Sequence, residues 1–130
     1  MESKIINGKI ELIKRDDQIY VYKAINKCTL DMETAEAMTK AGDEWNGTAV
    51  CGNLVDIRDM LFVDSKVRNY AAEQYRKHVA GSAILADSKF TVSFANFFLK
   101  FSKPKVPTKL FNKEEDAIRW LKDQIRKHKD

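Results

Sequence analysis

The chain has 130 residues, 44% of them hydrophobic and 32% charged, and a formal net charge of +4. This composition is typical of a globular protein with a hydrophobic core, and it excludes a disordered, collagen-like or disulfide-built chain. No apolar run approaches the roughly 20 residues needed to cross a bilayer, so no transmembrane segment is expected.

The first two predicted strands cover residues 9–15 and 18–25, which are rich in β-forming residues and are separated by Asp16-Asp17. This pattern predicts an antiparallel hairpin. A helix is expected from Asp31, as its N-cap, to about Trp45, because apolar residues recur there every three or four positions. After Asn46-Gly47, residues 48–57 are expected to form a buried strand.

The second half of the chain alternates helices and strands. A helix is expected to begin at Asp64-Ser65 and to run to about His78. Further elements are predicted as a strand at 81–87, a helix at 90–102, a strand at 106–111 and a last helix capped by Asn112 with Glu115. The order β-β-α-β-α-β-α-β-α predicts a single α/β domain over residues 1–130. Its sheet should be mixed and mostly parallel, with four or five strands, an antiparallel N-terminal hairpin and about four helices.

The predicted strands at 48–57 and 81–87 are expected to be parallel neighbours in this sheet. One shared core is expected to contain Val50, Leu54, Ile84, Leu85, Phe97, Leu110 and Leu121.

No sequence motif of a known catalytic site occurs in the chain. GxxxxGK[ST], GxGxxG, HExxH and GxSxG are all absent. Neither His78 nor His128 lies in a pattern that suggests a triad. Asp56 and Asp59 follow a predicted strand end, but Arg58 between them favours an ordinary ion-paired loop. We therefore expect no enzyme activity and no cofactor.

Cys28 and Cys51 lack the spacing of a zinc site, so no metal is expected and both should be buried hydrophobes. The start MESKIINGKI does not have the pattern of a secretory signal, which with the reduced cysteines indicates a cytoplasmic protein. After residue 100 there are nine Lys or Arg residues and five acids. These charges are expected to solvate the last helix, and no pattern indicates nucleic-acid binding.

The third predicted helix has apolar residues on nearly every side. Phe94, Phe97, Phe98 and Phe101 have the spacing of a core-facing stripe, yet other apolar residues lie off that stripe. Such a helix needs a second partner surface. Self-association into a homodimer, an apolar ligand, or coverage by loops of the same chain each satisfies this need. The candidate interaction or apolar-ligand surface consists of Val92, Ala95, Phe98 and Leu99.

Two stretches of the chain carry a family resemblance. VCGNLVDIRDMLFVDSKV, residues 50–67, and FANFFLKFSKPKVPTKLFNKEEDAIRWL, residues 94–121, resemble the STAS domain family and its SpoIIAA-like group, which includes short bacterial proteins described as STAS or Sec14-like. The resemblance implies a SpoIIAA-like fold and a regulatory role with protein partners. It also implies that Ser65, which follows Asp64, is the candidate phosphoacceptor of a partner kinase.

The sequence departs from the family pattern directly after this serine. Lys66 and Val67 stand where the family has a second hydroxyl residue and a glycine. We therefore expect Asp64 to be a plain N-cap and Ser65 to be a first-turn residue. The predicted function is a non-enzymatic, dimeric STAS-like interaction module. The alternative is a carrier or sensor of a lipid or other apolar ligand, bound in a groove near residues 92–101.

Overall fold

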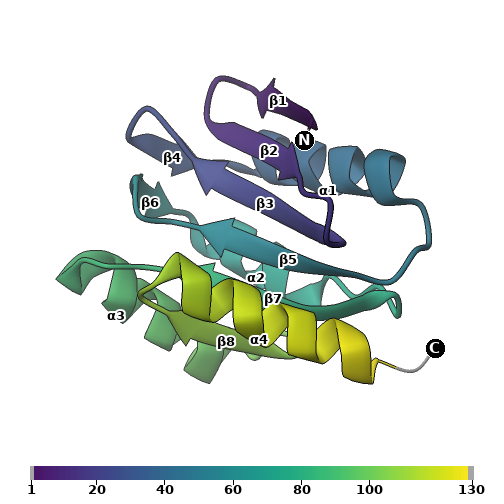
Figure 1. Cartoon of the computed structure of the whole chain (residues 1–130). Helices are drawn as coiled ribbons and strands as arrows, with labels where there is room; N and C mark the ends of the chain where they lie inside the picture. Colours follow the sequence, from purple (N-terminus) through teal and green to yellow (C-terminus); the bar gives the residue numbers. More distant parts are fainter. Residues whose placement is uncertain (1, 129–130) are drawn as a thin grey trace.

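The computed structural model describes residues 2–128, which form a six-stranded sheet with helices on both faces (Figure 1). The strand order in this sheet is β1-β2-β3-β5-β7-β8. The strands are β1 (Glu2–Ile6), β2 (Ile10–Lys14), β3 (Ile19–Ala24), β5 (Cys51–Asp56), β7 (Val79–Leu85) and β8 (Thr108–Phe111). The first three pair antiparallel, and β3, β5, β7 and β8 pair parallel.

The predicted fold class is therefore confirmed, as are the hairpin and the parallel neighbours β5 and β7. The sheet is larger than expected because β1 extends it by one antiparallel strand. Asn7 and Gly8 both have positive φ, at 52° and 68°, and make the tight turn that folds β1 back on β2. A separate parallel pair, β4 (Cys28–Leu30) and β6 (Met60–Val63), was also not predicted.

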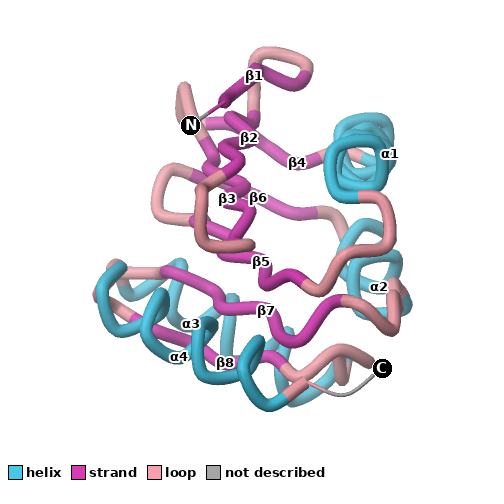
Figure 2. The backbone as a smooth tube through the Cα atoms, turned by 45° about the vertical axis from the view of Figure 1, so that its right-hand side comes forward, coloured by secondary structure: helices cyan, strands magenta, loops and turns pink. Residues whose placement is uncertain are grey.

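Four α-helices cover the sheet: α1 (Met32–Asn46), α2 (Ser65–Glu73), α3 (Lys89–Phe97) and α4 (Glu114–Lys127). A short π-helical segment, η1 (Phe98–Ser102), continues α3. Helix α4 packs alone against β3, β5, β7 and β8, whereas α1, α2 and α3 lie on the other side of the sheet (Figures 1 and 2). We call the α4 side the closed face and the other side the open face.

Side-chain caps fix the starts of three helices. Asp31 accepts a hydrogen bond from the Thr34 amide at 2.8 Å, as predicted for α1. Ser88 and Thr91 form a capping box at the start of α3. The predicted cap of α4 by Asn112 is wrong, because the N-cap position is Lys113 and makes no side-chain cap bond. Instead, the acidic residues of the first turn of α4 face the positive end of its dipole.

The single core predicted from the sequence is also wrong, because the sheet divides it in two. Leu54, Leu85 and Leu121 are fully buried together on the closed face. Ile84 belongs to the cluster on the open face, and half-buried Leu110 packs against that cluster. Successive residues of a strand point to opposite faces, so Ile84 and Leu85 cannot share one core. Val50 is half-buried just before β5.

Candidate functional site

The first residue of α2, Ser65, lies at the end of a short loop after β6. Asp64 has an extended backbone, and its carboxylate accepts a hydrogen bond from the Lys66 amide at 2.8 Å. This is the N-cap that the sequence predicts. Ser65 itself is exposed, and its hydroxyl makes no hydrogen bond to the rest of residues 2–128. Whether it is phosphorylated stays a prediction.

A surface hollow lies beside Ser65. Its walls include Phe62 from β6, Phe90 from the start of α3, and Arg68, one turn beyond Ser65 on α2. The guanidinium of Arg68 lies over the ring of Phe97, 4.7 Å from its centroid. Segments far apart in the sequence therefore meet at the start of α2.

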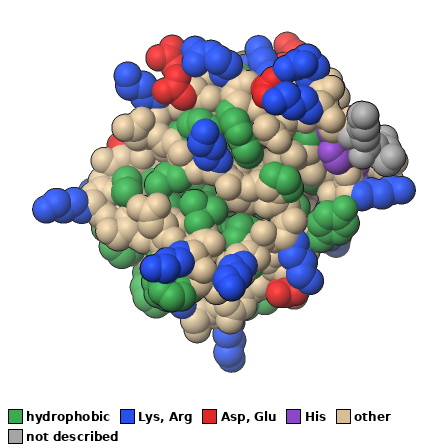
Figure 3. Space-filling model, turned by 90° about the horizontal axis from the view of Figure 1, so that it is seen from below, with side chains coloured by type: hydrophobic (Ala, Val, Ile, Leu, Met, Phe, Trp, Pro, Cys, Tyr) green, Lys and Arg blue, Asp and Glu red, His purple; other side chains and the backbone are tan. Residues whose placement is uncertain are grey.

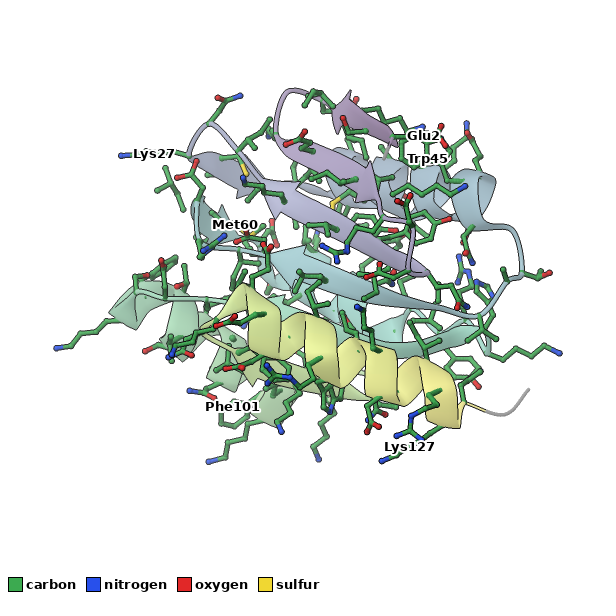
Figure 4. The ribbon with its side chains drawn as sticks, in the orientation of Figure 1. Glu2, Lys27, Trp45, Met60, Phe101 and Lys127 are labelled. Atoms are coloured by element: carbon green, nitrogen blue, oxygen red, sulfur yellow. The ribbon has the colours of Figure 1, made fainter. Side chains whose placement is uncertain are left out.

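Four exposed phenylalanine side chains lie in this region: two line the hollow, and the other two continue from Arg68 along α3 and η1. Phe62, Phe90 and Phe101 are 59%, 53% and 62% exposed, and Phe97 is 44% exposed. The rings of Phe97 and Phe101 are in contact, with centroids 4.7 Å apart. Figure 4 shows Phe101 at the periphery of the molecule, below the helices. We call Phe62, Phe90, Phe97 and Phe101 the aromatic surface.

Cationic side chains accompany the aromatic surface. Besides Arg68 over Phe97, the ammonium group of Lys100 lies 5.4 Å from the centroid of Phe101. Seen from below, hydrophobic side chains lie among lysine and arginine side chains, with few acidic groups between them (Figure 3). A partner for this region would therefore combine apolar and acidic side chains.

The helical phase of α3 differs from the one predicted. Ala95 is fully buried, Phe98 is nearly so, and Val92 and Leu99 pack against the open-face core. These four residues therefore do not form an exposed surface, although Phe98 lines the cavity described below; that they bind a partner or an apolar ligand stays a prediction. Ala95 lets the helix backbone approach the sheet closely. The larger Phe97, predicted to be buried, is left on the outside.

A cavity of about 250 Å³ lies on the open face, between the sheet and helices α1 and α2, with Phe98 at its η1 end. Its lining is mostly apolar, but the strands contribute polar groups. Asn53, Ser82 and Thr108 are register partners on β5, β7 and β8 and form what we call the polar row. The predicted groove near residues 92–101 is thus replaced by a cavity that only Phe94 and Phe98 of that segment help to line.

Tyr22 projects from β3 into the same region. Its hydroxyl lies against Gly42 of α1, where any Cβ would overlap it. Burial raises the pKa of Tyr22 above its ordinary value. Within residues 2–128 the side chains of Tyr22, Asn53 and Ser82 have no hydrogen-bond partner. Sequence reasoning missed these residues, although Asn53 and Ser82 are visible as polar residues inside otherwise apolar strands.

The carboxylates singled out in the sequence have structural roles. Buried Asp56 accepts two hydrogen bonds from the Arg58 guanidinium, at 2.8 and 3.0 Å, which confirms the expected ion-paired loop. Asp59 accepts from the Lys27 amide at 2.9 Å. Within residues 2–128, no three His, Cys, Asp or Glu side chains gather as a metal site would require. None of the described helices is long and apolar enough to span a membrane.

Two solved structures define the class of fold. One is an uncharacterized protein of the DUF3478 family with a SpoIIAA-like fold, from Shewanella loihica PV-4. It shares 20% sequence identity with this chain, and the two superpose with a TM-score of 0.58. The match covers 86% of this chain and 91% of that one. The other is an anti-sigma factor antagonist from Mycobacterium paratuberculosis, with 19% identity and a TM-score of 0.59 over 88% and 93%. This chain therefore has the SpoIIAA-like fold that its resemblance to the STAS family implies.

The family assignment is more specific than the fold. Residues 13–125 match the family described as "Domain of unknown function (DUF7793)", and the chain belongs to that family. No curated protein matches its sequence.

Proposed function

We propose that this protein is a non-enzymatic regulatory module that binds a partner protein through the aromatic surface beside Ser65. The observation that carries the proposal is the set of four exposed phenylalanines, of which Phe62 and Phe90 line the hollow at the start of α2. Large apolar side chains that are exposed together mark interaction sites in soluble proteins. The proposal of a regulatory role is supported by the shared fold of an anti-sigma factor antagonist, which is a regulatory protein.

The chemistry of the aromatic surface favours a protein partner. Binding energy at protein interfaces is concentrated in aromatic and arginine side chains that become fully desolvated, and Arg68 over Phe97 presents both in one place. The lysine and arginine side chains nearby favour an acidic partner and would raise its association rate. The proposed partner is therefore a protein segment with apolar anchors and an acidic rim.

Self-association would use the same surface. The predicted homodimer would bury Phe97 and Phe101 of each copy, and its test is the molar mass in solution. We also propose, as the sequence predicts, that residues 1–130 form a single domain and that the protein is cytoplasmic.

Site-specific photocrosslinking tests the protein-binding surface directly. A photoreactive phenylalanine analogue at position 90 or 101 should crosslink a defined protein in cells. The control position is Tyr75, which is 57% exposed but lies outside the aromatic surface. Crosslinks at positions 90 and 101, absent at 75 and lost in the Phe97→Ser variant, would support the proposal.

The same experiment has outcomes that contradict it. Equal crosslinking at all three positions would show that the aromatic surface is not selective. Binding of the protein to anionic vesicles, lost in Phe97→Ser, together with no protein crosslink, would replace the partner protein by a membrane surface. A crosslink only to a second copy, with a dimer mass by light scattering, would restrict the function to self-association.

A further inference from the structure

The open-face cavity carries a further inference, which shares Arg68 with the aromatic surface but concerns a different kind of ligand. Its volume of about 250 Å³ exceeds the roughly 150 Å³ of an engineered cavity that binds benzene. Met60, Ile84 and Phe98 are among its apolar walls, so it can enclose the apolar body of a small molecule.

The floor of the cavity is polar where a structural core would be apolar. Asn53 and Ser82 lie side by side on β5 and β7, the two central parallel strands. Strands covered on both faces normally carry apolar residues there. Asn53, Ser82 and Tyr22 make no side-chain hydrogen bond within residues 2–128, so their polar groups are available to water or to a ligand in the cavity.

The cavity also has one cation without an anionic partner. Arg76, at its other end, is paired with Asp43 at 2.9 Å. Arg68 lines the cavity but forms no ion pair within residues 2–128, and its buried Nε has no hydrogen-bond partner. An unpaired guanidinium in partly apolar surroundings favours a carboxylate, which it can bind through two parallel hydrogen bonds.

We propose that the open-face cavity binds a small amphipathic carboxylic acid, with an apolar body of roughly ten carbon atoms or fewer. Arg68 binds the carboxylate, the apolar walls enclose the body, and Asn53, Ser82 and Tyr22 donate or accept hydrogen bonds along the floor. No covalent step is involved. Because Arg68, Val63 and Phe94 line both the cavity and the hollow at Ser65, the ligand lies directly behind the aromatic surface.

Calorimetric titration of the full chain with octanoate tests the proposal, with 1-octanol as the uncharged probe of the same length. Wild-type protein should bind one octanoate, and more tightly than octanol. Arg68→Met should weaken octanoate binding by about tenfold or more, because a charged hydrogen bond is lost, and should leave octanol binding unchanged. Arg68→Lys should recover part of the loss.

Two further variants separate the site from general effects. Arg119→Met removes an exposed arginine from α4 on the opposite face and should not change binding. Asn53→Leu fills the floor with an isosteric apolar side chain and should weaken both probes while the protein stays folded by circular dichroism. Octanoate affinity that is equal in wild type, Arg68→Met and Asn53→Leu would overturn the proposal.

Native mass spectrometry of protein purified from its own host distinguishes the source of the acid. A bound mass corresponding to a free carboxylic acid would support the proposal. A phospholipid mass would overturn the proposed ligand class, since two acyl chains exceed the cavity volume of about 250 Å³.

Discussion

The two faces of the sheet are built from the same strands but pack differently. On the closed face, α4 lies so close to the strands that a Cβ on Gly52 would approach Leu121 to 3.1 Å, and one on Gly81 would approach Trp120 to 3.2 Å. Leu54, Leu85 and Leu121 are consequently fully buried there. A single helix is enough to bury these leucines.

On the open face three helices leave a cavity. The polar row is one reason, because packing an apolar helix directly onto Asn53 and Ser82 would leave their polar groups unsatisfied. Helix α2 also ends at Glu73, five residues earlier than predicted, so it covers less of the sheet. The closed face is therefore close-packed, whereas the open face retains polar groups and the volume in which we propose that a ligand binds.

The largest expected effect on stability comes from a substitution on the closed face. Leu121→Ala should lower the free energy of unfolding by about 2–5 kcal/mol, because it leaves a cavity in a fully packed cluster. The matched open-face change is Ser82→Ala, which should remain within about 1 kcal/mol of wild type since its hydroxyl has no protein partner. Urea unfolding measures both, and equal losses would abolish the distinction between the faces.

A second prediction concerns Cys51, which lines the open-face cavity. Burial raises the pKa of the Cys51 thiol to about 11, against about 8.5 for a free cysteine. At pH 7.5 its thiolate population, and hence its alkylation by iodoacetamide, should be on the order of a hundredfold lower than in the unfolded chain. The rate is measured in a Cys28→Ser background, so that only Cys51 reacts.

The raised pKa of Cys51 also makes the free energy of unfolding depend on pH. The native state favours the neutral thiol, so its contribution is complete below about pH 8.5 and is lost as the pH rises towards 11. Octanoate should slow the alkylation further if it occupies the cavity next to Cys51. Alkylation as fast as in denatured protein would show that the open face does not shield its cavity.

The smallest expected effects concern the start of α2. Asp64→Ala should cost about 0.5–2 kcal/mol as a lost N-cap, whereas Ser65→Ala should change stability by less than about 0.5 kcal/mol. Thermal and urea unfolding measure both variants. Equal costs would mean that the Asp64 cap adds nothing to α2.

Ser65→Asp separates this structural role from a switch. It should lower the crosslink yield, because the added negative charge repels an acidic partner, but it should not change which protein is crosslinked, since Lys66 and Val67 do not fit the family's phosphorylation pattern. A phosphate found on Ser65 in cells, with loss of the partner in Ser65→Asp, would instead make the start of α2 a phosphorylation switch.

The sequence by itself determined the order of the four α-helices and of β2, β3, β5, β7 and β8, the N-terminal hairpin, the parallel pairing of β5 with β7, and the caps at Asp31 and Asp64. These features depend on local signals: β-forming runs, helical periodicity and capping residues. Asn7-Gly8 carried a local hairpin signal as well, so β1 was within reach of the same reasoning.

Only the tertiary structure decided on which face of the sheet each residue packs. Ile84 and Leu85 look equivalent in the sequence but lie in different cores, because neighbours along a strand point to opposite faces. Phe97 and Phe98 also differ, because successive helical residues point about 100° apart and the packing of α3 turns Phe98 inward and Phe97 outward. The aromatic surface and the polar row join residues from separate elements, and their proximity arises from strand register and helix packing, which no local pattern encodes.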